Sequence, residues 1–124
     1  MSSKIPLYKV PVPSTAFTTE AYFEDKGPRP AVCFTYKSNG EEQEGQISFS
    51  RVAAMRTRAA RCCTPWHIEG AYDTLVEVED SAWVKEVRAD TQPLWKDKWP
   101  MHHYMIYLDS AGCFEVIAES WQVT

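Results

Sequence analysis

The clearest pattern of apolar and polar positions lies in the last quarter of the chain. Two runs rich in Tyr, Ile, Phe and Val, residues 102–108 and 113–121, flank the polar segment DSAG at 109–112. Asp suits the first position of a type I turn, and Gly accepts a positive φ at its end. The pattern therefore predicts a β-hairpin in which Leu108 lies opposite Cys113.

This register decides which side chains share a face of the hairpin. It places Met105, Tyr107, Phe114 and Val116 on one apolar face, which we expect to point into the core, with His103 near its end. The other face mixes apolar, aromatic and acidic side chains, namely His102, Tyr104, Ile106, Glu115, Ile117, Glu119 and Trp121. We expect this mixed face either to be covered by a helix or to contact another molecule.

Other segments show the alternation of apolar and polar residues that is typical of strands. It predicts strands over residues 4–13, 16–23, 31–36, 46–58 and 72–79, the first at a sheet edge because its prolines cannot donate ladder hydrogen bonds. An exposed turn at 38–40 joins the third and fourth strands as a second hairpin. Residues 52–60 also have helix propensity, so a helix stays open as the alternative to a strand with a bulge near Arg51 and Val52.

Two capping oxygens, from Asp80 and Ser81, predict one short helix over residues 82–88. Residues 62–67 and 90–100 have the composition of loops. A chain of 124 residues suffices for one domain with its own core. We therefore expect a single mainly β domain over residues 1–124, built as a single antiparallel sheet or a β-sandwich of about six or seven strands with one short α-helix.

Charge and hydropathy exclude two classes of protein. With 13 basic and 17 acidic residues the formal net charge is −4, whereas a general nucleic-acid binder needs a basic surface. No apolar run approaches the length of a membrane span, and the segment MSSKIPLYKV lacks a signal-peptide core. We expect a cytoplasmic protein that binds neither nucleic acid nor membrane, with its cysteines reduced.

The sequence offers three candidate sites, of which two are chemical: a zinc site and an acid–base site. Cys62, Cys63, His67 and His102 are competent zinc ligands, although they lack CxxC or HExxH spacing. His102 also lies roughly opposite Glu119 in the predicted register, and a carboxylate beside a histidine raises its pKa and orients it as a general base. No nucleophile loop accompanies them. We expect no cofactor, and a small hydrolase-like or zinc-binding protein is the alternative function.

The third candidate is a recognition surface. Acidic side chains around aromatic anchors suit a basic partner, because charge speeds the encounter and the rings supply affinity. Residues of these two kinds lie on predicted outward positions or in the preceding loop: Glu77, Glu79, Tyr104, Glu115, Glu119, Trp121, Trp95 and Trp99. This arrangement favours a non-enzymatic binding protein with a protein partner.

The second half of the chain also carries a resemblance. The run AYDTLVEVEDSAWV, followed by HHYMIYLDSAGCFEVIAESW, resembles a group of small uncharacterised bacterial proteins, some of which occur in contexts suggestive of toxin immunity. The resemblance covers about the last sixty residues. It implies a fold and a class, an immunity-type protein that neutralises a basic toxin domain, and brings no catalytic residues with it. The sequence determines neither the partner's identity nor the oligomeric state.

Overall fold

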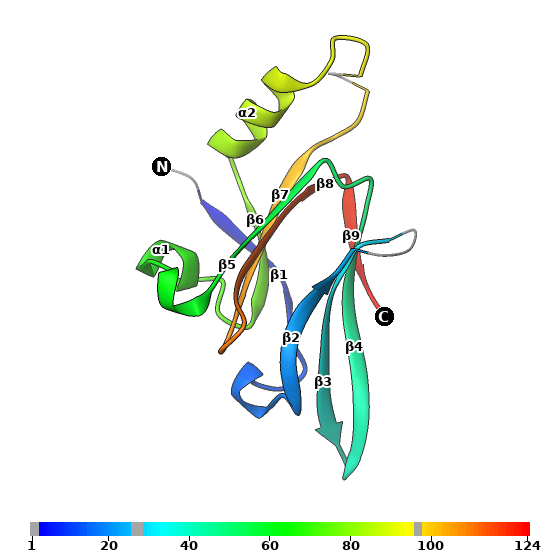
Figure 1. Ribbon diagram of the computed structural model, residues 1–124, viewed down its shortest axis with the longest axis vertical. Helices are drawn as coiled ribbons and strands as arrows, with labels where there is room; N and C mark the ends of the chain where they lie inside the picture. Colours follow the sequence, from blue (N-terminus) through cyan, green and yellow to red (C-terminus); the bar gives the residue numbers. More distant parts are fainter. Residues whose placement is uncertain (1–2, 26–28, 96–97) are drawn as a thin grey trace.

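The computed structural model describes residues 3–25, 29–95 and 98–124 and is mainly β (Figure 1). Within these residues the chain forms nine strands: β1 (Lys4–Lys9), β2 (Thr19–Glu24), β3 (Ala31–Ser38), β4 (Glu41–Ser50), β5 (Ala54–Arg58), β6 (Thr74–Val78), β7 (His102–Leu108), β8 (Gly112–Ala118) and β9 (Ser120–Val123). The same residues form two α-helices, α1 (Pro65–Ile68) and α2 (Ala82–Asp90), and two 3-10 helices, η1 (Ser14–Ala16) and η2 (Ala60–Cys62). The prediction of a mainly β fold is confirmed, with more strands than expected and a second α-helix.

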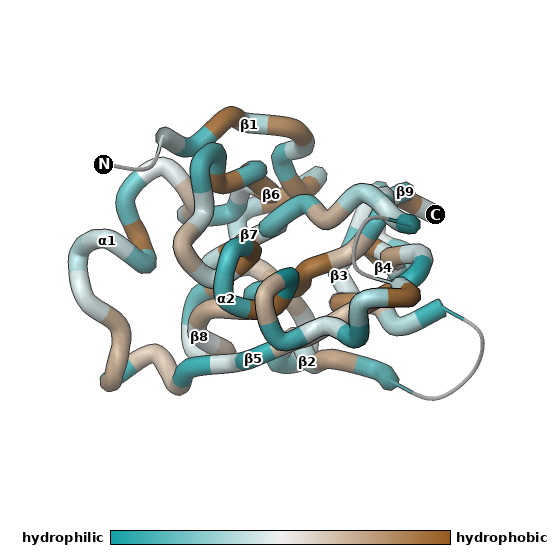
Figure 2. Tube along the Cα trace, turned by 90° about the horizontal axis from the view of Figure 1, so that it is seen from above, coloured by the Kyte–Doolittle hydropathy of each residue, from teal (hydrophilic) through white to brown (hydrophobic). Residues whose placement is uncertain are grey.

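The strands form two antiparallel sheets, so the alternative of a single sheet is wrong. The strand order is β1-β6-β7-β8-β5 in one sheet and β2-β3-β4-β9 in the other. Seen from above, β6, β7 and β8 of the five-stranded sheet lie to the left of β3, β4 and β9 of the four-stranded sheet (Figure 2). Both contribute to one buried cluster, with Phe34 and Phe49 from the smaller sheet and Ile106 and Phe114 from the larger. Burial of this shared apolar surface holds the two sheets together.

The segment 46–58 contributes a strand to each sheet. β4 ends at Ser50, and Arg51 takes a positive φ of 52°, which turns the chain out of the four-stranded sheet. β5 then begins at Ala54 and pairs with β8 along its whole length. The predicted strand to residue 58 is confirmed, interrupted where the bulge was expected, and the helical alternative is wrong. This crossing makes β5 the last strand of the five-stranded sheet.

The predicted hairpin of β7 and β8 forms, but its register is shifted by one residue. Leu108 pairs with Gly112 and Tyr107 with Cys113, so that only residues 109–111 remain as the loop. Gly112 has a φ of 101° and lies so close to β5 that a Cβ there would be 2.1 Å from the carbonyl oxygen of Arg58. Glycine is therefore required at this position. β8 begins at Gly112, one residue earlier than predicted.

The shift moves one set of hairpin side chains to the opposite face. Phe114 and Val116 point toward the four-stranded sheet, as members of the shared cluster. Met105 and Tyr107 lie on the outer face instead, in a second cluster with Cys113 that the η2–α1 segment partly covers. The prediction that Met105, Tyr107, Phe114 and Val116 point inward together is therefore wrong, because the shifted register places the first two and the last two on opposite faces of the hairpin.

Local predictions around the helices are partly confirmed. Ser81 is the N-cap of α2, and its Oγ accepts a hydrogen bond from the Val84 N–H at 3.2 Å. The loop predicted over 62–67 instead contains the start of α1, where the Thr64 N–H donates to Nδ1 of His67 at 3.0 Å. Proline at the first helical position favours this start. The proline-rich first strand, β1, is an edge strand as predicted.

Candidate functional site

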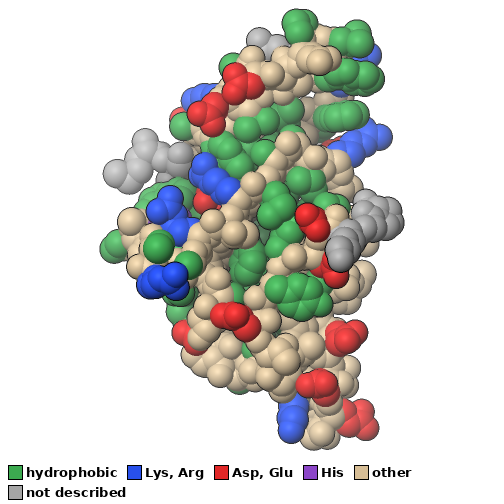
Figure 3. Space-filling view, viewed as in Figure 1, with side chains coloured by type: hydrophobic (Ala, Val, Ile, Leu, Met, Phe, Trp, Pro, Cys, Tyr) green, Lys and Arg blue, Asp and Glu red, His purple; other side chains and the backbone are tan. Residues whose placement is uncertain are grey.

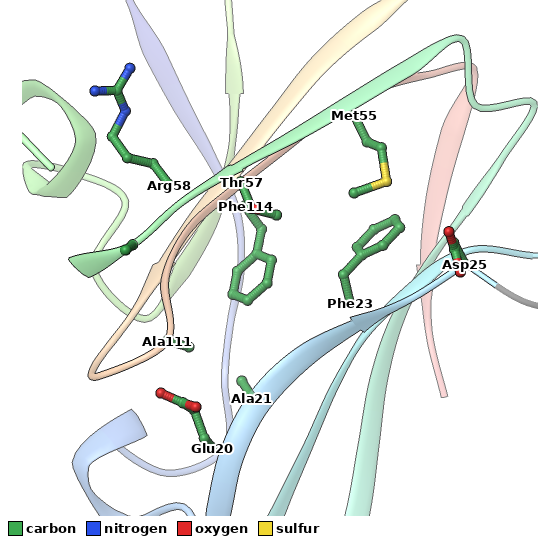
Figure 4. Close-up of a pocket in the computed structure, with 10 residues that line it drawn as sticks. Glu20, Ala21, Phe23, Asp25, Met55, Thr57, Arg58, Ala111 and Phe114 are labelled. Atoms are coloured by element: carbon green, nitrogen blue, oxygen red, sulfur yellow. The ribbon is translucent and has the colours of Figure 1, made fainter. Parts of the chain in front are cut away.

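A groove of about 470 Å³ opens between β2 and β5, the last strands of the two sheets at one side of the molecule (Figure 4). Ten residues line it: Glu20, Ala21, Phe23, Asp25, Met55, Thr57, Arg58, Ala59, Ala111 and Phe114. In Figure 4, Phe23 and Met55 point toward one another from the two strands, and Phe114 lies deeper on the hairpin. We call this hollow the β2–β5 groove.

The groove exists because the four-stranded sheet ends before it covers β5. Met55 and Thr57 pair with Val116 and Phe114, which belong to the shared core, so these two side chains also point toward the interior. Met55 is nevertheless 38% exposed. An interior-facing apolar side chain that stays exposed along a groove is typical of a contact surface rather than of a completed core.

Charged side chains stand around this apolar centre. Glu20 and Asp25 lie toward opposite ends of β2, and Arg58 lies on the β5 side (Figure 4). Figure 3 shows hydrophobic side chains across the middle of this face, with acidic side chains toward β2 and basic ones toward α1. The β2 wall is therefore the acidic wall of the groove.

The groove is better suited to binding than to catalysis. Among the described residues that line it there is no His, Cys or Ser that would act as a nucleophile or a base near neutral pH. Its two carboxylates stand apart, at the two ends of β2, and so do not form an acid–base pair across one bond (Figure 4). What the groove offers is an apolar floor with a carboxylate toward each end of β2 and Arg58 on the β5 side.

The predicted pair of His102 and Glu119 does not form. Nδ1 of His102 lies 2.8 Å from Oε2 of Glu77, on the neighbouring strand β6. Glu119 instead forms an ion pair with Arg51, with a distance of 3.2 Å between Oε2 and Nε. Glu79, just beyond β6, is exposed. The predicted acid–base site is therefore not assembled, because the register that brought His102 and Glu119 together was wrong.

Sequence reasoning missed a buried polar cluster on the outer face of the five-stranded sheet. Nε2 of His103 lies 2.8 Å from Oε1 of Glu115, and its Nδ1 lies 2.8 Å from Oγ of Ser81. Arg56 donates two hydrogen bonds to Glu115, at 3.0 and 3.1 Å, and its guanidinium lies 3.9 Å from the centre of the Trp83 ring. Burial by itself raises the pKa of Glu115, but hydrogen bonds from His103 and Arg56 outweigh it and lower the pKa to about 2.

Ser81, His103 and Glu115 are hydrogen-bonded in series, in the same order as the serine nucleophile, the histidine base and the carboxylate of a serine hydrolase. Ser81 is only 6% exposed, however, and its Oγ already accepts the cap bond from Val84. A hydroxyl held in this way links the start of α2 to β7. The predicted register missed this cluster because its hairpin loop of four residues placed His103 and Glu115 on opposite faces. A loop of three residues, as observed, places them on the same face.

The predicted zinc ligands are not brought together. Nδ1 of His67 lies 2.9 Å from Oγ1 of Thr64 at the start of α1, and Cys63 Sγ lies 3.4 Å from the Ala59 carbonyl oxygen. His102 is committed to Glu77 on another part of the sheet. Across residues 3–25, 29–95 and 98–124, no three His, Cys, Asp or Glu side chains are grouped so that they could hold a metal ion. The set Cys62, Cys63, His67 and His102 therefore does not form a site in this fold.

The predicted acidic aromatic surface does not form as one face. Tyr104 and Glu115 are 4% and 3% exposed and lie on opposite sides of the five-stranded sheet. Trp121 is half-buried against the shared core. Trp95 and Trp99 are exposed and stack on each other, with 5.8 Å between ring centroids. Only part of the predicted surface is therefore accessible. Sequence reasoning did not find the β2–β5 groove.

Comparison with known proteins adds no name to this fold: no family model, no curated protein and no solved structure matches the chain. Within the described part of the chain, neither α-helix is long and apolar enough to cross a membrane.

Proposed function

We propose that this protein is a non-enzymatic cytoplasmic binding protein of the immunity type, whose β2–β5 groove receives part of a basic protein partner. The observation that carries the proposal is Met55, an interior-facing side chain on an edge strand that is 38% exposed beside an apolar groove. Covering this side chain and its neighbours removes apolar surface from water, which drives association. A partner that fills the groove completes the core at this side.

Charge supports a basic partner. Glu20 and Asp25 stand on the β2 wall of the groove, and the formal net charge of the chain is −4. Negative charge around an apolar centre speeds the encounter with a basic surface, while the apolar contact supplies affinity. Both features agree with a toxin domain that carries excess positive charge.

The test uses the neighbouring reading frame, which the proposal expects to encode a basic toxin domain. The purified toxin domain is titrated with this protein in a calorimeter. Met55→Arg should weaken binding by at least about tenfold, because it fills the groove with a charge of the partner's own sign. Ile5→Arg is the matched control, because Ile5 is also an apolar edge-strand residue that is 38% exposed, on β1 at the opposite edge of the same sheet.

Two results contradict the proposal. One is the absence of a neighbouring toxin domain that binds this protein. The other is binding that responds equally to Met55→Arg and to Ile5→Arg, since a groove-specific contact distinguishes them.

A serine hydrolase is the second candidate, and the hydrogen-bonded series from Ser81 through His103 to Glu115 favours it. Its test is separate from the binding test. Covalent labelling of Ser81 by a fluorophosphonate probe, lost in His103→Ala, would support catalysis. A folded protein that stays unlabelled removes this candidate.

A further inference from the structure

The β2–β5 groove lies between the edges of two sheets, and this geometry selects an extended chain as its occupant. We infer that the partner segment enters the groove as a β-strand and pairs with the backbone of β5. It carries apolar residues at alternate positions and a Lys or Arg near each end. The inference rests on the proposed function and adds the conformation and the chemistry of the segment that is bound.

The edge of β5 is regular along its whole length. All five of its residues, Ala54–Arg58, pair with β8 in one unbroken register. β5 is the last strand of its sheet, and in the part of the chain that the structure describes no strand pairs with its other side. Such an edge presents backbone N–H and C=O groups at the spacing that an added strand requires.

The opposite wall, β2, is less suited to backbone pairing. Its register with β3 shifts between Thr19 and Tyr22, so the strand carries a bulge beside the groove. A bulge interrupts the regular spacing of backbone groups and twists the edge. An added strand should therefore extend the five-stranded sheet, while β2 contributes side-chain contacts only.

The side chains around the groove specify the pattern of the bound segment. Successive side chains of an added strand point alternately into the groove and away from it. Those that point inward meet Phe23, Met55 and Phe114, so apolar residues fit there. Glu20 in β2 and Asp25, the residue directly after β2, are five positions apart, or about 17 Å at the rise of a strand. Basic residues therefore fit near both ends of a segment of about seven residues.

The probe is the heptapeptide Lys-Thr-Val-Thr-Val-Thr-Lys with blocked ends, in which all Lys and Val side chains share one face when the chain is extended. Its binding to the full protein is measured by fluorescence anisotropy of a dye-labelled form. Met55→Arg should weaken binding by at least about tenfold, and Ile5→Arg should leave it unchanged. Exchanging both lysines of the peptide for glutamates should also weaken binding by at least about tenfold, because of Glu20 and Asp25.

Backbone pairing is tested with two N-methylated forms of the same peptide, one methylated at the Val residues and one at the Thr residues. Alternate amides of an extended chain point to opposite sides, so only one set faces β5. One form should therefore bind at least about tenfold more weakly than the other. Amide hydrogen exchange of Ala54–Arg58 should slow on binding, while that of β2 should not change.

Several results would overturn the inference. The first is that the heptapeptide does not bind. The second is that the two N-methylated forms bind equally well, and the third is that the glutamate peptide binds as tightly as the lysine peptide. A dimer of this protein that Met55→Arg abolishes would identify a second copy as the occupant and would overturn it too. If the toxin domain still binds in a manner that depends on Met55, these results reject the extended basic segment and leave the proposed function standing. Failure of the proposed function appears separately, in the toxin-domain titration.

Discussion

The buried carboxylate of Glu115 should make the stability of this fold depend on pH. Burial raises its pKa, but hydrogen bonds from His103 and Arg56 outweigh that influence and lower the pKa from 4.5 to about 2. A carboxyl group whose pKa is lower in the folded state stabilises the fold above its unfolded pKa. That stability is lost as the pH falls toward the folded value. The shift corresponds to about 3 kcal/mol, lost between about pH 5 and pH 2.

Glu115→Gln removes the titrating group and keeps its approximate shape. At pH 7 the variant should be about 3 kcal/mol less stable than the wild type, because glutamine stands in for the protonated carboxyl. As the pH falls, the wild type loses this advantage and the variant does not. About 2 kcal/mol of the difference should be gone by pH 3, and the two stability curves should converge near pH 2.

The assay is urea unfolding followed by tryptophan fluorescence, at several pH values between 7 and 3. The control is Glu79→Gln, because Glu79 is an exposed glutamate just beyond β6. This control should keep the pH dependence of the wild type. If the difference in free energy of unfolding between the wild type and Glu115→Gln stays constant over this range, the network does not hold Glu115 ionised and the reasoning is refuted.

Two further substitutions, with Gly40→Ala as a control, test the hairpin and the helix cap. Gly112→Ala should lower the free energy of unfolding by more than about 2 kcal/mol, because a Cβ would lie 2.1 Å from the Arg58 carbonyl oxygen at a φ of 101°. Gly40→Ala, at a φ of 80° with nothing within 4 Å of the new Cβ, should cost only about 1 kcal/mol. Ser81→Ala should cost about 1–2 kcal/mol through the lost cap of α2 and the lost contact with His103. Urea denaturation measures all three, and an equal cost at the two glycines, or no cost at Ser81, is the contradictory outcome.

Features that depend on local chemistry were predictable from the sequence. Ser81 caps α2 because its hydroxyl reaches an N–H only three residues away. The turn at Asn39 and Gly40 follows from two residues that accept a positive φ, and both have one. Most strands were located by alternation or by their content of β-branched and aromatic residues. The thiol of Cys113 lies in an apolar strand run and is buried, and burial raises its pKa to about 12.

The register of the β7–β8 hairpin was decided by tertiary structure. Both faces of these strands are covered, and the polar His103 and Glu115 are buried on the outer face, so the pattern of polar and apolar residues did not distinguish one register from the next. The close approach of Gly112 to the β5 backbone selects the observed register. This one-residue difference separated His102 from Glu119 and brought His103 and Glu115 together.

The β2–β5 groove also depends on tertiary structure alone. Its walls come from strands that are distant in the sequence, and its floor comes from the hairpin of β7 and β8. The turn at Arg51 sends the chain from the four-stranded sheet to the edge of the five-stranded sheet. Hydrophobic periodicity shows which face of a strand is apolar, but how far one sheet extends over another is a property of their packing. For this reason the sequence indicated that Met55 is an apolar residue on a strand, and only the folded chain left it exposed in a groove.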